Sequence, residues 1–185
     1  LRARLPLLVD VHGVAVRVAD AGGRLVAFAA TCPHLGGPLA DAVHALKYHG
    51  RPSLAGPLGA WLARRVEVPA GALVVSIPLG RGRRRARGYD QAMLLADAFC
   101  RTAKAERGRG ALLRLRETPP QVGRDREARI RNVAGAFAAR ASVSGRDVVL
   151  VDDVVTTGAT ADAAARALKA AGARSVAVLS LARAE

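Results

Sequence analysis

Two adjacent carboxylates are followed closely by three threonines and a glycine within residues 148–160. A carboxylate only accepts hydrogen bonds, so an adjacent pair suits the neighbouring hydroxyls of a ribose. Threonine hydroxyls can donate to a phosphate, and a glycine lets the backbone approach that phosphate without an intervening side chain. These residue types in this order predict a ribose-phosphate site. The residues are Asp152, Asp153, Thr156, Thr157, Gly158 and Thr160.

A simpler explanation is that Asp152 or Thr160 only caps a helix, because Asp and Thr are common at the N-cap position. One cap accounts for one residue, however. It leaves the second acid, the other threonines and the glycine unexplained. We therefore favour a ligand site over a helix cap.

The elements around this stretch should bring it to one edge of a sheet. Residues 148–151 form a short apolar run typical of a buried strand, and residues 161–171 predict a helix that ends at Gly172. The amino terminus of a helix favours an anion. Ligands of open parallel sheets bind beyond the carboxyl ends of the strands. We therefore expect the two acids at the point where the strand ends.

Strands and helices alternate along most of the chain. Apolar runs predict further strands over 72–78 and 175–181, and helical spacing predicts helices over 89–104 and 127–139. Residues 108–126 contain two adjacent prolines and are expected to form an exposed loop or hairpin. The alternation predicts an α/β fold with a mostly parallel central sheet.

The run 148–160 resembles the ribose-phosphate-binding signature of type I phosphoribosyltransferases, which bind 5-phosphoribosyl pyrophosphate (PRPP). The resemblance implies that Asp152 and Asp153 bind the ribose hydroxyls and that the loop after them holds the 5′-phosphate. It implies ligand contacts for seven consecutive residues: Val154, Val155, Thr156, Thr157, Gly158, Ala159 and Thr160.

Further motifs narrow the family. In chain order they are 46–51 (LKYHGR), 78–79 with Arg81, 87–92 (RGYDQA), 118–121 (TPPQ), 129–132 (RIRN) and 135–137 (GAF). Together they resemble the ComF family, which comprises phosphoribosyltransferase-like proteins associated with competence and DNA uptake. The resemblance covers residues 43–185 and implies the type I phosphoribosyltransferase fold.

Arginines follow the strand predicted over 72–78, in a segment expected to be a loop. In the related enzymes the corresponding loop holds the pyrophosphate, and the planar fork of Arg binds phosphate oxygens in pairs. The resemblance therefore gives Arg87 a catalytic role beside the two acids, and gives Arg81 and Gly88 ligand contacts. For the other arginines of this segment, a solvated basic surface explains the sequence equally well.

The sequence also gives expectations for the roles of three further polar residues and of a metal ion. Lys47 is either a phosphate contact or a helix-surface residue, and the sequence leaves both open. Gln121 and Arg129 could belong to a loop that closes over the site. Mg²⁺ is expected to arrive with PRPP, because a highly charged pyrophosphate is rarely bound without a cation, and Asp152 and Asp153 are its candidate side-chain ligands.

The first 41 residues differ from the rest. Two apolar runs, 14–18 and 25–30, flank a turn at 20–23 and predict a β-hairpin. We expect a β-rich amino-terminal segment over 1–41, followed by a phosphoribosyltransferase-like domain over 42–185.

Residues 24–41 resemble the first cluster-binding box of a Rieske iron–sulfur protein, in which Cys32 and His34 would be ligands. Such a cluster needs a second Cys and a second His. His49 could end a second box, but Leu46 stands where its Cys would lie, and Cys100 is on a distant predicted helix. We therefore predict no iron–sulfur cluster and an incomplete Rieske-like unit.

The chain has 185 residues and a formal net charge of +14, mostly from Arg. This charge indicates either a polyanionic partner or a compositional bias spread over the surface. Aromatic residues make up only 3% of the chain, so few are present to stack on nucleic-acid bases. Two distant cysteines and no signal peptide favour a cytoplasmic location, and no apolar run approaches the length of a membrane span.

Two functions are in competition. One is phosphoribosyl transfer, in which a nucleophile displaces pyrophosphate from C1 of PRPP; no residue of the sequence identifies the acceptor. The other is a non-catalytic module that binds PRPP or a nucleotide and acts in the uptake of single-stranded DNA with competence-machinery proteins. The incomplete Rieske-like unit also raises a third possibility, a defective fusion product with neither activity.

Overall fold

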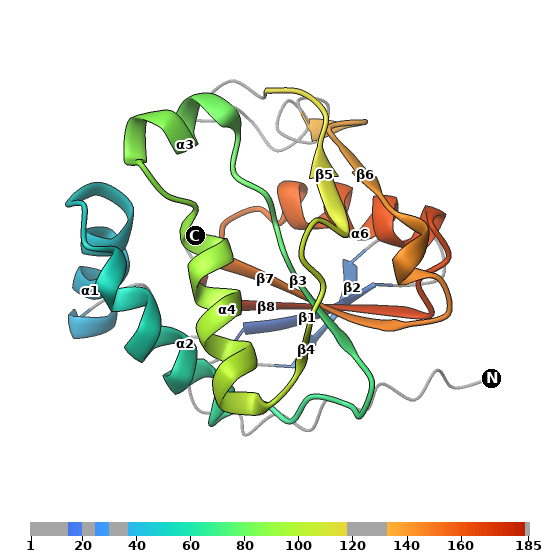
Figure 1. Ribbon diagram of the computed structural model, residues 1–185, viewed down its shortest axis with the longest axis horizontal. Helices are drawn as coiled ribbons and strands as arrows, with labels where there is room; N and C mark the ends of the chain where they lie inside the picture. Colours follow the sequence, from blue (N-terminus) through green and yellow to red (C-terminus); the bar gives the residue numbers. More distant parts are fainter. Residues whose placement is uncertain (1–14, 20–24, 30–36, 118–132, 184–185) are drawn as a thin grey trace.

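A six-stranded sheet lies at the centre of the computed structural model (Figure 1). The structure describes residues 15–19, 25–29, 37–117 and 133–183. In chain order the elements are β1 (Ala15–Ala19), β2 (Leu25–Ala29), α1 (Gly37–Tyr48), α2 (Ala55–Ala63), β3 (Leu73–Ser76), α3 (Arg81–Arg87), α4 (Gln91–Ala103), β4 (Glu106–Arg107), β5 (Leu112–Arg114), β6 (Phe137–Ala139), β7 (Asp147–Val155), α6 (Ala159–Ala170) and β8 (Ser175–Arg183).

The sheet has the strand order β2-β1-β8-β7-β3-β4 and is mostly parallel. Strands β4, β3, β7 and β8 are parallel, with Val74 opposite Val149 and Val149 opposite Ala177. The mostly parallel α/β fold expected from the sequence is confirmed. The predicted hairpin is also present, because β1 and β2 pair antiparallel, and β1 adds the hairpin to the edge of β8. The division into two domains stays a prediction.

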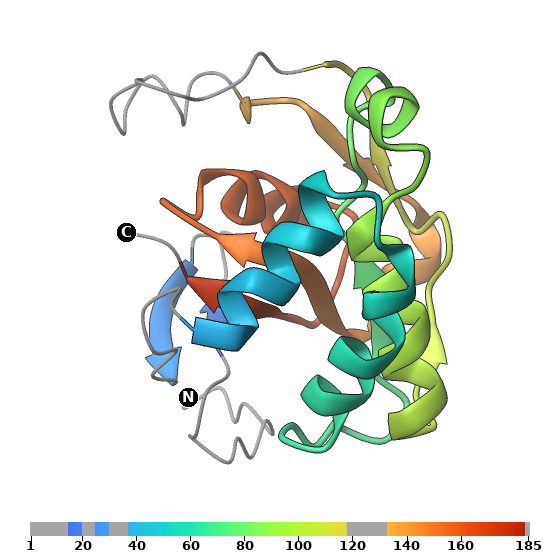
Figure 2. The same cartoon turned by 90° about the vertical axis from the view of Figure 1, so that its left-hand side faces the viewer.

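Both faces of the strands β3, β7 and β8 are buried, and the residues of these strands alternate between two clusters. Val149 and Val151 of β7 pack in a cluster with buried residues of α1, α2 and α4. Val148 and Leu150 pack on the opposite face with α6 and the β5–β6 ribbon. Figure 2 shows the helices in these two layers. An unbroken apolar strand is what a parallel sheet with two covered faces requires.

Some elements differ from the sequence-based predictions. The arginine run expected to be a loop forms α3, which is followed by Gly88 as its C-cap with φ +80°. It has no apolar periodicity to indicate a helix, although Arg and Ala are good helix formers. The last residues of the helix predicted over 127–139 instead form β6, which pairs antiparallel with β5. This long-range pairing overrides the local helical pattern.

The strand order reverses between β3 and β7. The chain leaves β3 through α3 and α4 to reach β4 on one side, and later enters β7 on the other side. In open α/β sheets, ligands bind in the crevice beyond the carboxyl ends of the strands at such a switch point. The topology therefore predicts a ligand site at the carboxyl ends of β3 and β7.

Candidate functional site

A cleft of about 220 Å³ lies at this switch point. Residues from α1, the β3–α3 connection, α3, α4, β5 and β7 line it. Its charged lining includes four cationic side chains and an acid pair: Lys47, Arg83, Arg87, Arg114, Asp152 and Asp153. Cations and anions in one cleft suit a ligand with both hydroxyls and phosphates.

A second, smaller cavity of about 40 Å³ adjoins the cleft in the loop between β7 and α6. It is lined by Asp152 and by residues 154–161. Gly158 is the N-cap of α6 and has φ +81°, a conformation that glycine adopts without strain. This loop and the helix that follows form a cradle suited to an anion. Because Asp152 lines both cavities, one ligand could extend from the cradle past the acid into the cleft.

The acid pair lies within β7, which continues through both acids to Val155 rather than ending before them as predicted. Asp153 is buried, and its Oδ1 accepts from the Val154 N–H at 2.6 Å and lies 3.2 Å from Lys47 Nζ. Its Oδ2 is buried and has no hydrogen-bond partner in the described part of the chain. The site thus holds a buried carboxylate oxygen with an unmet need for a donor or a cation.

Asp152 is electrostatically strained by its neighbour. Its Oδ1 accepts from the Asp153 N–H at 2.8 Å. Burial, and then the adjacent charge of Asp153, raise the pKa of Asp152 well above its usual value, while Lys47 opposes the rise. Lys47 is therefore a counter-ion of the pair, a role that differs from both the phosphate contact and the helix-surface position considered from the sequence. Lys47 opposes this rise in pKa without cancelling it, although Arg114 also interacts electrostatically with Asp152.

The facing wall of the cleft is positively charged. Burial, and then the nearby charge of Arg83, lower the pKa of Arg114. Arg114 Nη1 donates to the Pro78 carbonyl at 3.2 Å. The Arg87 guanidinium lies 5.2 Å from the centre of the Tyr48 ring, and its buried Nη1 has no hydrogen-bond partner among the described residues. Crowded guanidinium groups favour an anion between them.

The connection after β3 is held in place by α4. Asp90 is buried and caps this helix, because its Oδ1 accepts from the Met93 N–H at 3.0 Å. Its Oδ2 accepts from the Leu79 N–H at 2.8 Å. Leu79 lines the cleft, so the helix cap also fixes the cleft wall.

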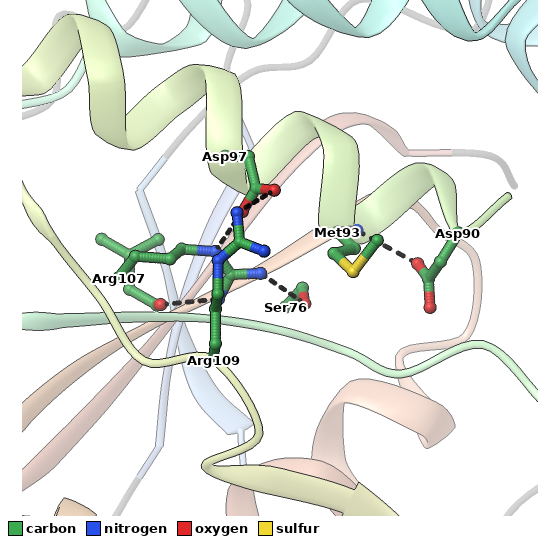
Figure 3. Close-up of polar contacts among 7 residues, drawn as sticks. Ser76, Asp90, Met93, Asp97, Arg107 and Arg109 are labelled. Atoms are coloured by element: carbon green, nitrogen blue, oxygen red, sulfur yellow. Dashed lines mark hydrogen bonds and ion pairs between the residues drawn. The ribbon is translucent and has the colours of Figure 1, made fainter.

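A second set of hydrogen bonds, made by Arg107, joins α4 to β3 (Figure 3). Arg107 donates from Nε to Asp97 at 2.9 Å and from Nη2 to the hydroxyl of Ser76 at 2.9 Å. Its Nη1 donates to the Val74 carbonyl at 3.0 Å. Arg107 thus links α4, β4 and the carboxyl end of β3, from which the cleft wall begins.

The structure brings most of the predicted site residues together. The cleft is lined by Arg87, Asp152, Asp153, Val154, Thr156 and Thr160. The smaller cavity adds Val155, Thr157, Gly158 and Ala159. Arg81 and Gly88 are exposed and line neither cavity. Outside the described residues lie Gln121, Arg129, Cys32 and His34.

Sequence reasoning missed several residues of the cleft. Arg83 lies four residues before Arg87, so on a helix both are on one face, whereas Arg81 is not. This signal appears only once α3 is known to be a helix. Arg114 comes from β5, and no local pattern links it to the site. Tyr48 and Asp90 were within recognised motifs, but no role followed from their sequence positions.

The described residues give little information on the metal, iron–sulfur and membrane-spanning features that the sequence analysis considered. In the described ranges, no group of three or more His, Cys, Asp and Glu side chains is arranged to hold a metal ion. The absence of an iron–sulfur cluster stays a prediction, because Cys32 and His34 are outside those ranges. Within the same part of the chain, no helix combines the length and apolar character needed to cross a bilayer.

Comparison with known proteins identifies the type of domain that carries this site. Residues 114–185 match the family model described as the phosphoribosyl transferase domain. The chain is 36% identical over 169 residues to the DNA utilization protein YhgH of Escherichia coli K12, covering 86% of this chain and 72% of that protein. It is 33% identical over 114 residues to Competence protein F of Haemophilus influenzae, covering 60% of this chain and 50% of that protein.

Proposed function

Because this chain belongs to the ComF-like family of proteins with a type I phosphoribosyltransferase domain, we propose that its cleft binds PRPP. The bound PRPP would be the donor of a phosphoribosyl group in a transfer reaction of the glycosyltransferase class. The acceptor and the cytoplasmic location stay predictions.

The observation that carries this proposal is the position of the under-compensated acid pair between two anion sites. The cradle before α6 lies on one side, and the arginine-lined wall of the cleft lies on the other. PRPP has the same order of groups, because its ribose hydroxyls lie between a 5′-phosphate and a pyrophosphate on C1. The acids would accept from the hydroxyls, and backbone N–H groups and threonines would hold the 5′-phosphate.

Mg²⁺ fits this site as a ligand-borne ion. The unpartnered Oδ2 of Asp153 and the raised pKa of Asp152 are features that a nearby cation would relieve. These acids would hold the ion together with pyrophosphate oxygens, consistent with the preference of Mg²⁺ for one or two carboxylates and substrate phosphates. When bound, the ion would offset negative charge on the departing pyrophosphate.

In the proposed reaction, an acceptor lone pair forms a bond to C1 of the ribose as the bond from C1 to pyrophosphate breaks. The bonding electrons leave with the pyrophosphate. Arg87 and Arg114 would bind that leaving group, while the acid pair orients the ribose. Asp90 would keep the Leu79 N–H in place on the cleft wall. The protein would therefore act by position and charge.

Isothermal titration of PRPP with Mg²⁺ tests the proposal. We expect micromolar-range binding by the wild type and at least a roughly hundredfold loss in the double variant Asp152→Asn/Asp153→Asn, since hydrogen bonds to charged groups contribute about 1.5–3 kcal/mol each. Asp147→Asn is the matched control, because it removes a carboxylate from the opposite end of the same strand. No binding by a folded wild type, or equal binding by the double variant, would refute the PRPP assignment.

A second candidate function is a non-catalytic module that binds PRPP or a nucleotide and acts in single-stranded DNA uptake with competence-machinery proteins. The printed names of the relatives, DNA utilization protein and Competence protein F, favour it. So does α3, whose seven residues include five arginines. Exposed arginines on one helix suit contacts to a phosphate backbone.

Binding of a single-stranded oligonucleotide at increasing salt tests this second function. Phosphate contacts predict a steep fall in affinity with salt, and Arg84→Ala/Arg85→Ala should reduce the slope by about 1.4, because each contact to a single strand contributes about 0.7. Both arginines are exposed and neither lines the cleft, so PRPP binding should be unchanged. Affinity that hardly varies with salt would count against this function.

A further inference from the structure

Glu117 places a carboxylate against the connection between β3 and α3. Its Oε1 accepts from the Gly82 N–H at 3.2 Å. A Cβ on Gly80 would collide with this carboxylate, and the three heavy atoms nearest to that Cβ position all belong to Glu117. The chain after β5 lies beside α3 in both views (Figures 1 and 2). We call the bare backbone of Gly80, with the Gly82 N–H, the Gly80 notch.

The glycine at position 80 is explained by this contact rather than by its backbone conformation. Gly80 has φ −63° and ψ 148°, an extended conformation that any residue adopts. It is buried, and the space where a side chain would lie is filled by the Glu117 carboxylate. Glycine is suited to positions where another group approaches the backbone closely. The Gly80 notch therefore accommodates an anionic group, and in this structure that group belongs to the chain itself.

The carboxylate in the Gly80 notch lies in a strongly basic part of the molecule. The seven residues of α3 include five arginines and no acid. Burial and the charge of Arg83 lower the pKa of Arg114, whereas the charge of Glu117 acts to raise it. Glu117 therefore offsets part of the repulsion between the arginines of two separate elements, α3 and β5. It is an internal counter-ion of the arginine-lined wall.

Glu117 does not line the cleft, but the backbone that it contacts is continuous with the cleft wall. Pro78, Leu79 and Arg83 line the cleft, and they flank this backbone on both sides. A multiply charged anion that enters the cleft meets the same arginines that Glu117 partly neutralises. Because like charges repel, the carboxylate opposes the approach of that anion. Glu117 and a pyrophosphate group therefore compete for one basic wall.

We propose that Glu117 is an autoinhibitory anion, which neutralises the basic wall of the ligand-free protein and weakens the binding of a pyrophosphate group until it is displaced. This inference rests on the proposed binding of PRPP. The contact is the counterpart of the ion pair between Lys47 and Asp153, so that both the acidic and the basic wall of the cleft have a counter-ion from the chain. Displacement of Glu117 from the Gly80 notch then accompanies the arrival of the ligand.

Isothermal titration of inorganic pyrophosphate with Mg²⁺ tests the competition. Glu117→Gln removes the charge and keeps the shape of the side chain, so it should bind pyrophosphate roughly two- to fivefold more tightly than the wild type, the range of an exposed ion-pair contribution. Its affinity for ribose 5-phosphate, which has no pyrophosphate group, should be unchanged.

Gly80→Ala tests the notch while the acid is kept, because the added Cβ takes the space of the carboxylate. It should also tighten the binding of pyrophosphate. In the Glu117→Ala background, Gly80→Ala should have no further effect, since the group that it displaces is already absent. A tightening that persists in that background would show that the effect of Gly80→Ala does not act through Glu117, and would overturn the inference.

Glu106→Gln is the matched control, since Glu106 is also an exposed acid but pairs with Arg146 and lines neither cavity. It should leave both affinities unchanged. Equal or weaker binding of pyrophosphate by Glu117→Gln would overturn the autoinhibitory role alone, and weaker binding would make Glu117 a positioning residue for α3. Failure of the wild type to bind both PRPP and pyrophosphate would instead overturn the proposed function, and this inference with it.

Discussion

Strand β7 carries acids at both ends, Asp147 at its first residue and the acid pair near its last, and their surroundings differ. Asp147 accepts hydrogen bonds from Arg174 Nε at 2.8 Å and from the Ser175 hydroxyl at 2.7 Å, and Arg174 Nη2 binds its second oxygen. The Arg174 hydrogen bond is the main cause of the lowered pKa of Asp147. At the other end Lys47 pairs with Asp153, and the pKa of Asp152 is raised.

The difference separates a stabilising end of the strand from the end at which we propose that the ligand binds. At the amino end, the polar atoms of the acid are satisfied by other parts of the chain. At the carboxyl end, the protein keeps two charges close together and leaves one buried oxygen without a partner among the described residues. Such an arrangement costs stability unless a ligand compensates it, as is common at functional sites.

The largest expected effect comes from removing the lysine that partly compensates the acid pair. Lys47→Met should lower the free energy of unfolding by about 3 kcal/mol near neutral pH, because breaking a buried ion pair leaves charge uncompensated. The loss should shrink in acid, where the carboxylates are protonated. Chemical denaturation at several pH values measures it, with exposed Lys104→Met as the control. An unchanged stability would show that the acid pair needs no counter-ion.

Asp152→Asn should separate binding from stability. We expect PRPP affinity to fall about a hundredfold, from the loss of a charged hydrogen-bond acceptor. Thermal stability should rise, because the variant removes the repulsion with Asp153.

The pH dependence of this gain has a definite sign. Since the pKa of Asp152 is raised in the folded state, the wild type loses stability as the pH rises from the ordinary Asp pKa through the raised one. The Tm difference between variant and wild type should therefore widen above about pH 4. An Asp152→Asn variant less stable than the wild type at neutral pH would contradict the inference that repulsion between Asp152 and Asp153 destabilises the folded protein.

Asp90→Asn tests whether Asp90, whose two oxygens both accept hydrogen bonds, contributes to PRPP binding by positioning the cleft wall. Asn can still cap α4, but the Met93 and Leu79 N–H groups bind different oxygens of Asp90, and Asn replaces one of those oxygens with an NH₂ group that cannot accept. PRPP affinity should fall about tenfold, the equivalent of one hydrogen bond of about 1.4 kcal/mol, while affinity for ribose 5-phosphate stays the same. Titration of both ligands gives the ratio, with Asp147→Asn as the control. An equal loss for the two ligands would indicate a general structural effect.

Asp147→Asn should give the smallest effect and only on stability. We expect Tm to fall by about 2–4 °C at neutral pH, the shift for about 1 kcal/mol in a domain of this size. Because the pKa of Asp147 is lowered in the folded state, this stabilisation is present above the ordinary Asp pKa and is lost as the pH falls through the lowered one. The Tm values of variant and wild type should converge in acid. A loss of PRPP binding in Asp147→Asn would show that the amino end of β7 also contributes to ligand binding, contrary to the distinction between its two ends.

Local sequence patterns predicted the helices and strands that bury an apolar run. They also predicted the polar residues that directly follow such a run. The buried strand, the acid pair and the small-residue loop could be identified because they are contiguous. The hairpin of β1 and β2 also has a local turn signal, but its pairing with β8 joins residues far apart in sequence. The β5–β6 pairing is similar, since Leu113 lies opposite Ala138. A one-dimensional pattern carries no information on such pairings.

The sequence by itself determined the α/β class, the family and the acid pair, because strand periodicity and contiguous motifs depend on neighbouring residues. Only the tertiary structure decided which cations face those acids. Lys47 reaches Asp153 from α1, Arg83 joins Arg87 through the helical phase of α3, and Arg114 arrives on β5. The physical reason is that charge compensation depends on distance in space, which the packing of separate elements sets.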